Sequence, residues 1–271
     1  RAANRDLLDE GALSVARFTD DGKVVWEKLI QGQGPLTAEK GFRDQGELLV
    51  KTRFAAAELG ATKMDRPEGF TTNPVTGRVY AVMTKNAKRK PGDENAPNPR
   101  AENKWGHILE LIPPGEGKDA DHTADVYGWD ILLLAGDPAD PAVGAKYNPG
   151  TSKDGWLVTP DNIAFDPKGR AWICTDGAND FDIADGVYAC DTDGPGRALT
   201  RLFFACPSGA EATGACFTPD GETLFVSVQH PGENSESLEK LTTHWPTMDP
   251  SKPPMPAVVV FTRQGGGEIG A

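Results

Sequence analysis

The sequence predicts an all-β protein with β-propeller architecture, and three observations support this. A strand–turn–strand pattern recurs loosely three times from residue 66 onward. The 31 glycines and 22 prolines make up about a fifth of the 271 residues, which is typical of a turn-rich chain. Only one segment shows the apolar spacing of a helix. We therefore expect a single partial propeller domain over residues 1–271.

The first predicted elements are a hairpin and a helix. Residues 13–29 alternate apolar and polar side chains around an Asp21-Gly22 turn, a strong hairpin signal. Residues 38–59 place apolar side chains three and four positions apart, with Thr37 as a start cap and Gly60 as an end cap. We expect this helix to be an insertion that packs on the β scaffold.

The repeat carries most of the fold prediction. Its copies span residues 66–80, 160–173 and 211–226, and each contains a short strand, a Pro-x-Gly or Pro-x-x-Gly turn and a second strand. Further strand-like runs lie between or after the copies, at 108–112, 126–134, 187–191, 199–205 and 257–263. This gives about three blades and part of another. Propellers close with four to eight blades, so the sequence predicts an incomplete propeller with further blades N-terminal to Arg1.

Two segments interrupt the repeats. Residues 85–104 are rich in Lys, Arg, Pro and Asn, and residues 135–156 contain two Asp-Pro pairs and one Pro-Gly pair. Both are predicted to be long loops, and loops of this length in compact domains are often functional.

The composition excludes some classes of function. Asp and Glu (40) outnumber Lys and Arg (28), which gives a net charge of −12 and argues against nucleic acid as a partner. A small anionic substrate would then need local positive charge, which bound metal ions supply. No apolar run reaches 18 residues, so no membrane span is predicted. The chain begins at Arg1 without methionine, which suggests processing or a longer polypeptide.

Acidic residues open the repeats. Glu68 and Asp161 each lie six positions before the turn proline of their copy, so equivalent strands would present both carboxylates at one depth of the channel. Asn162 follows Asp161, and Glu211 lies eight positions before its proline, one β period further out. Oxygen donors of this kind suit calcium, magnesium or ferric iron. The alternative is that they are solvated strand ends.

Three further residues are weaker candidates. Asp176 closes a second strand and could either reach a metal ion or form a turn. His230 follows another strand and could contact phosphate or act as a general acid, or be an ordinary loop residue. Arg100 could bind an anion through its guanidinium, or be a solvated loop residue. Motifs of serine hydrolases, zincins and P-loop NTPases are absent from the sequence.

A series of short motifs resembles the PhoX family of alkaline phosphatases. The motifs match in order and context over residues 66–233, and include Arg66-Pro67-Glu68-Gly69, Asn98-Pro99-Arg100, Pro160-Asp161-Asn162, Thr175-Asp176-Gly177, Glu211-Ala212-Thr213-Gly214 and Gln229-His230-Pro231-Gly232-Glu233. Each motif alone is weak, but their common order is specific.

The resemblance implies a six-bladed propeller that holds ferric iron and calcium and hydrolyses phosphate monoesters. It implies a periplasmic or extracellular location after twin-arginine export. By matching motifs, Glu68 and Glu211 would be metal ligands. The resemblance also implies that a cysteine and further acids from a preceding region complete the iron site, which the four cysteines of this sequence do not match.

Two other functions remain open at this point. Calcium-dependent propeller lactonases or arylesterases also place Glu, Asn and Asp on a channel-bound calcium. A propeller can also serve as a binding scaffold without catalysis, because fold alone does not fix function.

Overall fold

A computed structural model describes Arg5 and residues 11–270 of the chain. The chain forms two compact units, and the single partial propeller domain stays a prediction. The first unit comprises residues 1–63 and 123–129, and the second comprises residues 64–122 and 130–271. In the described part of the chain, no helix has the length and apolar character needed to cross a membrane.

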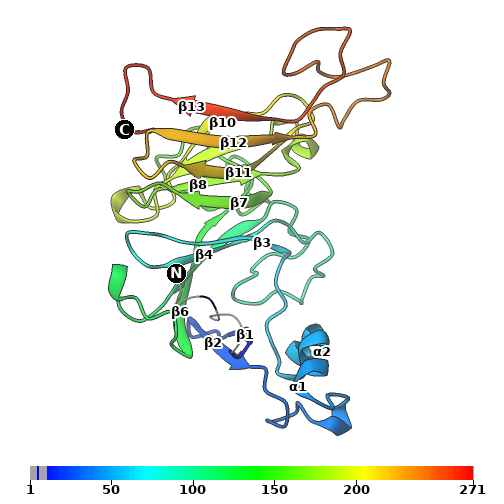
Figure 1. The fold of residues 1–271 in the computed structure, drawn as a ribbon, viewed down its shortest axis with the longest axis vertical. Coiled ribbons are helices and arrows are strands. Elements are labelled where there is room, and N and C mark those ends of the chain that lie inside the picture. Colours follow the sequence, from blue (N-terminus) through cyan, green and yellow to red (C-terminus); the bar gives the residue numbers. More distant parts are fainter. Residues whose placement is uncertain (1–4, 6–10, 271) are drawn as a thin grey trace. The chain divides into compact units, whose positions relative to one another are not determined.

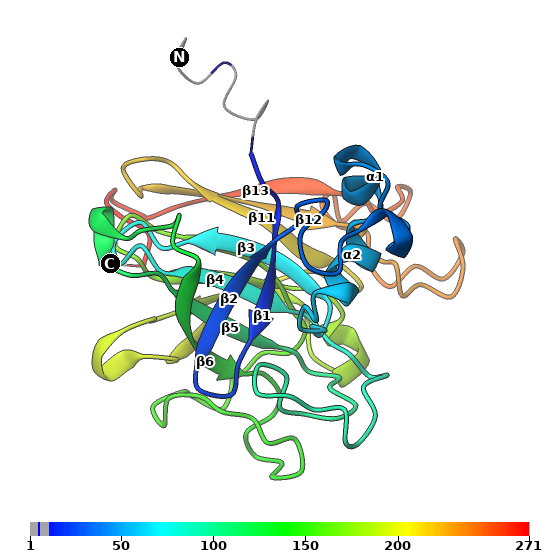
Figure 2. The same cartoon turned by 90° about the horizontal axis from the view of Figure 1, so that it is seen from below.

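The first unit contains the predicted hairpin. Strands β1 (Ser14–Phe18) and β2 (Lys23–Lys28) pair antiparallel, and β2 pairs with the beginning of β6 (Val126–Leu134) (Figure 2). The turn between β1 and β2 contains Gly22 at φ 77°, a conformation that favours glycine.

The predicted helix 38–59 is wrong in its continuity. The segment forms a 3-10 turn (Ala38–Lys40) and two short helices, α1 (Gln45–Val50) and α2 (Thr52–Glu58). Gly41 ends the first turn at φ 92°, and the Asp44 carboxylate caps α1 by accepting from the amide of Glu47. Thr37, the predicted cap, makes no such bond.

The second unit is built from antiparallel strands that follow the predicted repeat. Each copy supplies two adjacent strands: β3 (Pro67–Thr72) with β4 (Val79–Met83), β7 (Pro160–Phe165) with β8 (Ala171–Thr175), and β11 (Glu211–Phe217) with β12 (Thr223–Gln229). Outer strands extend these pairs: β5 (His107–Ile112) beside β4, β9 (Gly186–Cys190) and β10 (Thr200–Ala205) beside β8, and β13 (Ala257–Thr262) beside β12.

The first strands of the three copies are neighbours. Strand β7 contacts β3 on one side and β11 on the other, and Figure 1 shows the three one above another. Each starts opposite the end of its second strand, in the pairs Pro67–Met83, Pro160–Thr175 and Glu211–Gln229. The starts of β3, β7 and β11 therefore meet at one end of the sheets.

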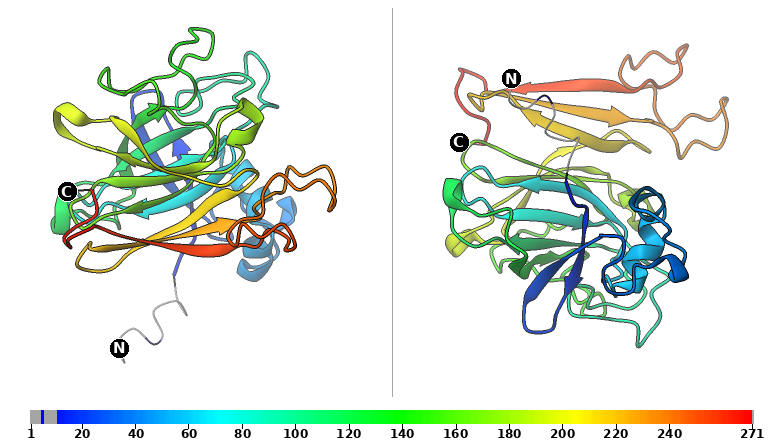
Figure 3. Two further views of the ribbon diagram at one scale, coloured as in Figure 1. Left: turned by 90° about the horizontal axis from the view of Figure 1, so that it is seen from above. Right: turned by 60° about the horizontal axis from the view of Figure 1, so that its bottom comes forward.

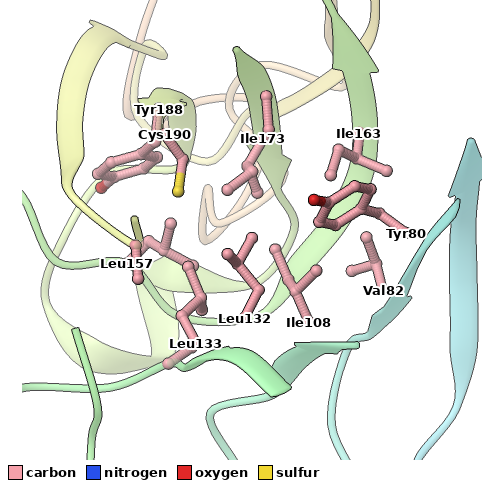
Figure 4. Close-up of a cluster of buried hydrophobic side chains, with 13 residues drawn as sticks. Tyr80, Val82, Ile108, Leu132, Leu133, Leu157, Ile163, Ile173, Tyr188 and Cys190 are labelled. Carbon is pink, nitrogen blue, oxygen red and sulfur yellow. The ribbon is translucent and has the colours of Figure 1, made fainter. Parts of the chain in front are cut away.

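Two apolar cores hold the second unit together. One joins the strands of the first two copies and includes Tyr80, Ile108, Leu133 and Ile173, all fully buried (Figure 4). The other lies around Trp172 and Leu224, between the second and third copies. Burial of each such side chain stabilises the fold by about 1.5–3 kcal/mol.

The two predicted long loops, residues 85–104 and 135–156, contain no helix or strand, and all their residues are described. A third long loop, over residues 230–256, extends from the end of β12 and is visible in Figure 3. Cys174, Cys190 and Cys206 are buried free thiols, as expected for small apolar residues, whereas Cys216 is exposed.

Candidate metal and phosphate site

The site lies where β3, β7 and β11 begin. All three strands carry a β-bulge there: register shifts occur between Pro67 and Phe70, between Pro160 and Asn162, and between Thr213 and Cys216. A bulge re-aims the side chains next to it. Glu68 and Asp161 lie inside their bulges, and Glu211 lies at the first position of β11.

Glycine brings two of these strands unusually close. A Cβ atom added to Gly69 would lie 2.6 Å from the carbonyl oxygen of Asp161 and 3.0 Å from the amide nitrogen of Ile163. A side chain at position 69 would therefore push β3 away from β7. This close approach explains the glycine next to Glu68.

A carboxylate–imidazole cluster forms at the ends of the second and third copies. One ligand atom each of Asp176, Glu211 and His230 lies within 4.8 Å of the others. The Oε2 atom of Glu211 accepts from the side-chain Nε2 of Gln229 at 2.8 Å and lies 3.1 Å from Nε2 of His230. Oxygen and imidazole donors at this separation are able to hold a metal ion.

Asp161 and Glu68 extend this acidic cluster. Burial, together with the negative charges of Glu68 and Asp176, raises the pKa of Asp161 to about 6. Burial and the charges of Asp176 and Asp161 raise the pKa of Glu211 to about 7, although the hydrogen bond with His230 opposes this shift. Both shifts show that negative charges crowd together here, and a bound cation would relieve that repulsion.

Both ring nitrogens of His230 lie close to oxygen atoms. Its Nδ1 atom lies 3.4 Å from the carbonyl oxygen of Gly209 and 3.3 Å from the carboxylate of Glu233. Burial lowers the pKa of His230, but the hydrogen bond with Glu211 and the charge of Glu233 outweigh it, so the net shift is upward.

Asn162, a predicted metal ligand, makes hydrogen bonds to β11. Its Oδ1 atom accepts from the hydroxyl of Thr213 and, at 2.9 Å, from the amide of Gly214. These bonds connect β7 to β11 and occupy the oxygen that the sequence assigned to a metal ion. A direct role of Asn162 as a ligand stays a prediction.

The structure does not bring Arg100 into this cluster. Its guanidinium donates to the main-chain carbonyls of Ala135, Val143 and Gly106, and it lies over the Trp105 ring at 5.4 Å. These contacts connect the two long loops. Anion binding by Arg100 has no support from this arrangement, because its outer nitrogens are used in holding the loops.

Sequence analysis missed three residues near the cluster. Buried Asp185 accepts from the amides of Gly177 and Ala178 and the hydroxyl of Thr175, and so fixes the turn that carries Asp176. The Nε atom of Arg66 lies 2.9 Å from the Glu68 carboxylate, although the sequence offered it only as part of a motif. Lys85 extends to Gly177, next to Asp176, and no sequence motif distinguishes it from the other charged residues of its loop.

Comparisons with known proteins identify the family. A family model described as "Alkaline phosphatase PhoX" matches residues 1–232. The chain belongs to the PhoX alkaline phosphatase family. Among the curated proteins, none matches the chain.

A solved structure has the same fold. It is Pseudomonas fluorescens PhoX in complex with vanadate, a transition state analogue, with a TM-score of 0.87 and 38% sequence identity. The match covers 99% of this chain and 47% of that one, so the chain spans about half the length of this PhoX structure. The prediction of an all-β propeller fold is confirmed, while the number of blades stays a prediction.

Proposed function

We propose that this chain contributes to a metal-dependent phosphatase that hydrolyses phosphate monoesters for phosphate acquisition. The observation that carries the proposal is the convergence of Asp176, Glu211 and His230 within 4.8 Å, in a chain that belongs to the PhoX family. Blades outside this segment, the predicted partner of these three copies, would complete the site.

The residues present fit metal ions. Glu68, Asp161, Asp176 and Glu211 supply hard oxygen donors, and burial together with repulsion between neighbouring carboxylates raises the pKa values of Asp161 and Glu211. We propose calcium and ferric iron as the ions, because both prefer such ligands. When bound, they supply the positive charge that phosphoryl transfer needs at the non-bridging oxygens.

The protein groups would control the proton and the geometry. Glu211 and the Gly209 carbonyl orient His230, and the raised pKa of His230 favours its protonated form. A protonated imidazole in this position could donate to an oxygen of the ester or of the product. Asp185 and the bulges keep the carboxylates in place.

The first experiment combines elemental analysis with an assay on p-nitrophenyl phosphate. We expect iron and calcium in the purified protein together with turnover, in this chain or in a longer polypeptide that contains it. Calcium alone with lactone hydrolysis would instead support a lactonase or arylesterase, and absence of metal would support a binding scaffold. A periplasmic or extracellular location is also proposed, and cell fractionation would test it.

A further inference from the structure

Lys85 extends from the first copy of the repeat to the second. The amide of Thr84 donates to the carbonyl of Arg66 at 3.1 Å, so Lys85 leaves β4 opposite the start of β3. Its ammonium lies 3.2 Å from the position that a Cβ atom would occupy on Gly177, the residue after Asp176. The side chain therefore connects the Glu68 end of β3 with the Asp176 turn.

The ammonium group of Lys85 has no direct partner among the described residues. Lys85 is partly buried, and among the described residues no ion pair or hydrogen bond involves its Nζ atom. The chain carries a net charge of −12, and four carboxylates gather in this region. A partly buried cation that pairs with none of them is available to an anion from solution.

The buried hydroxyl group of Thr159 lies near the same Cβ position on Gly177. Thr159 is fully buried, and its Oγ1 atom has no hydrogen-bond partner among the described residues. That atom lies 3.8 Å from the same Cβ position on Gly177. Buried polar groups are nearly always paired, so an unpaired hydroxyl and an unpaired ammonium that both lie within 4 Å of one Cβ position point to a ligand.

The backbone at Thr159 has an unfavourable left-handed conformation. Thr159 has φ 45°, which is unusual for a β-branched residue. Its amide donates to the Trp105 carbonyl at 2.7 Å, and its carbonyl accepts from the Asp176 amide at 3.1 Å. Strained residues of this kind cluster at functional sites.

We propose that Lys85 and Thr159 form a subsite that binds a non-bridging oxygen of the phosphoryl group, beside the carboxylate that Asp176 contributes. This inference rests on the proposed function, and it identifies how the chain itself recognises the anion. Lys85 supplies the charge, and the Thr159 hydroxyl supplies a second donor to the same group.

Inorganic phosphate is the probe that tests the subsite. Its affinity is measured by titration calorimetry on the metal-loaded protein, with metal content by elemental analysis for each variant. Lys85→Met should weaken phosphate binding at least about tenfold, and Lys85→Arg should restore much of it. Lys88→Met, an exposed lysine of the same loop, is the matched control and should bind as wild type.

Thr159→Val separates binding from folding. It keeps the β-branched shape and removes an unsatisfied buried hydroxyl, so its melting temperature should equal or exceed that of wild type. Its phosphate affinity should nevertheless fall about threefold or more. In turnover assays, both Lys85→Met and Thr159→Val should raise KM, with metal content unchanged.

The outcomes distinguish the subsite from the proposed function. Wild-type affinity for phosphate in both variants, with metal bound, would overturn the subsite and leave the phosphatase proposal standing. Wild-type protein that holds no metal and binds no phosphate would overturn both. Weaker binding in Lys85→Met and Thr159→Val, but not in Lys88→Met, supports the subsite.

Discussion

At the scale of single residues, the site depends on carboxylates held close together at the expense of stability. Glu211 is buried beside Asp176 and Asp161, and its burial, together with the charges of these neighbours, raises its pKa to about 7. A charge in such a place destabilises the metal-free fold and favours a bound cation. Function and stability therefore make opposite demands on this residue.

The Glu211→Gln variant tests whether this carboxylate supports metal binding and lowers the stability of the metal-free fold. We expect the variant to lose bound metal and more than about 100-fold of phosphatase turnover, because a charged oxygen donor is removed. Its metal-free form should melt on the order of 2 °C higher than wild type, because the amide removes a repulsive charge. Glu222→Gln, at an exposed turn position, is the control and should change neither property. Full metal content in Glu211→Gln would contradict the assignment.

The pH dependence of the metal-free protein follows from the same shifts. Asp161 and Glu211 bind protons more tightly in the folded state, with pKa values of about 6 and 7 against ordinary values of 3.8 and 4.5. The folded protein therefore holds more protons between about pH 4 and 7, and stability falls as pH rises through this range. The loss is complete only well above pH 7, because Glu211 is still half protonated at its own pKa.

Urea denaturation in the presence of a chelator checks this prediction at pH 5 and pH 8. The wild-type protein should lose more stability between these values than the Asp161→Asn, Glu211→Gln double variant, which lacks both carboxyls. An equal loss in the two proteins would show that other groups set the pH dependence.

At the scale of elements, the site depends on three strands that start together. The bulges in β3 and β7 aim the Glu68 and Asp161 carboxylates, and the bonds from Thr213 and Gly214 to Asn162 fix β11 on β7. The repeat in the sequence predicted these strands and their turns. The turns and alternating positions of each copy do not specify where its two strands shift register, and the bonds to Asn162 depend on contacts between different copies.

Gly69→Ala tests the close approach of β3 and β7. The added methyl group would meet the Asp161 carbonyl, so we expect a loss of about 1–3 kcal/mol in the free energy of unfolding and weaker metal binding. Gly46→Ala in α1 is the matched control. No backbone atom lies within 3.4 Å of its added Cβ, and alanine should favour the helix by about 0.5–1 kcal/mol. Unchanged stability in Gly69→Ala would show that β3 can shift away from β7 without cost, and would contradict a required close approach.

At the scale of the whole molecule, net charge and metal content act together. A chain with a net charge of −12 repels anions at long range, so a phosphate ester approaches it against the overall field. Local positive charge at the site is then necessary for binding. The structure offers Lys85 and His230 from the protein, and the carboxylate cluster provides a place for cations.

Removal of metal should therefore destabilise the whole fold. At pH 8 we expect excess EDTA to lower the melting temperature and abolish turnover, because metal ions that bind only the folded state stabilise it by mass action. EDTA already saturated with calcium is the control and should have a much smaller effect. An identical melting temperature with and without free EDTA would contradict a metal site in this chain.

The sequence by itself determined the fold class, the repeat, the family resemblance and most of the acidic residues of the site. These follow from local patterns: turn residues, alternating apolar positions and short motifs in a fixed order. The continuity of the predicted helix failed because Gly41 and the break at Lys51 interrupt the backbone.

Only the tertiary structure decided which candidates meet. It joined Asp176, Glu211 and His230, used Arg100 to hold two loops together, and placed the unmarked residues Lys85 and Thr159 beside Gly177. The physical reason is that these contacts connect strands and loops tens of residues apart. Their distances depend on how the sheets pack, which no local pattern in the chain encodes.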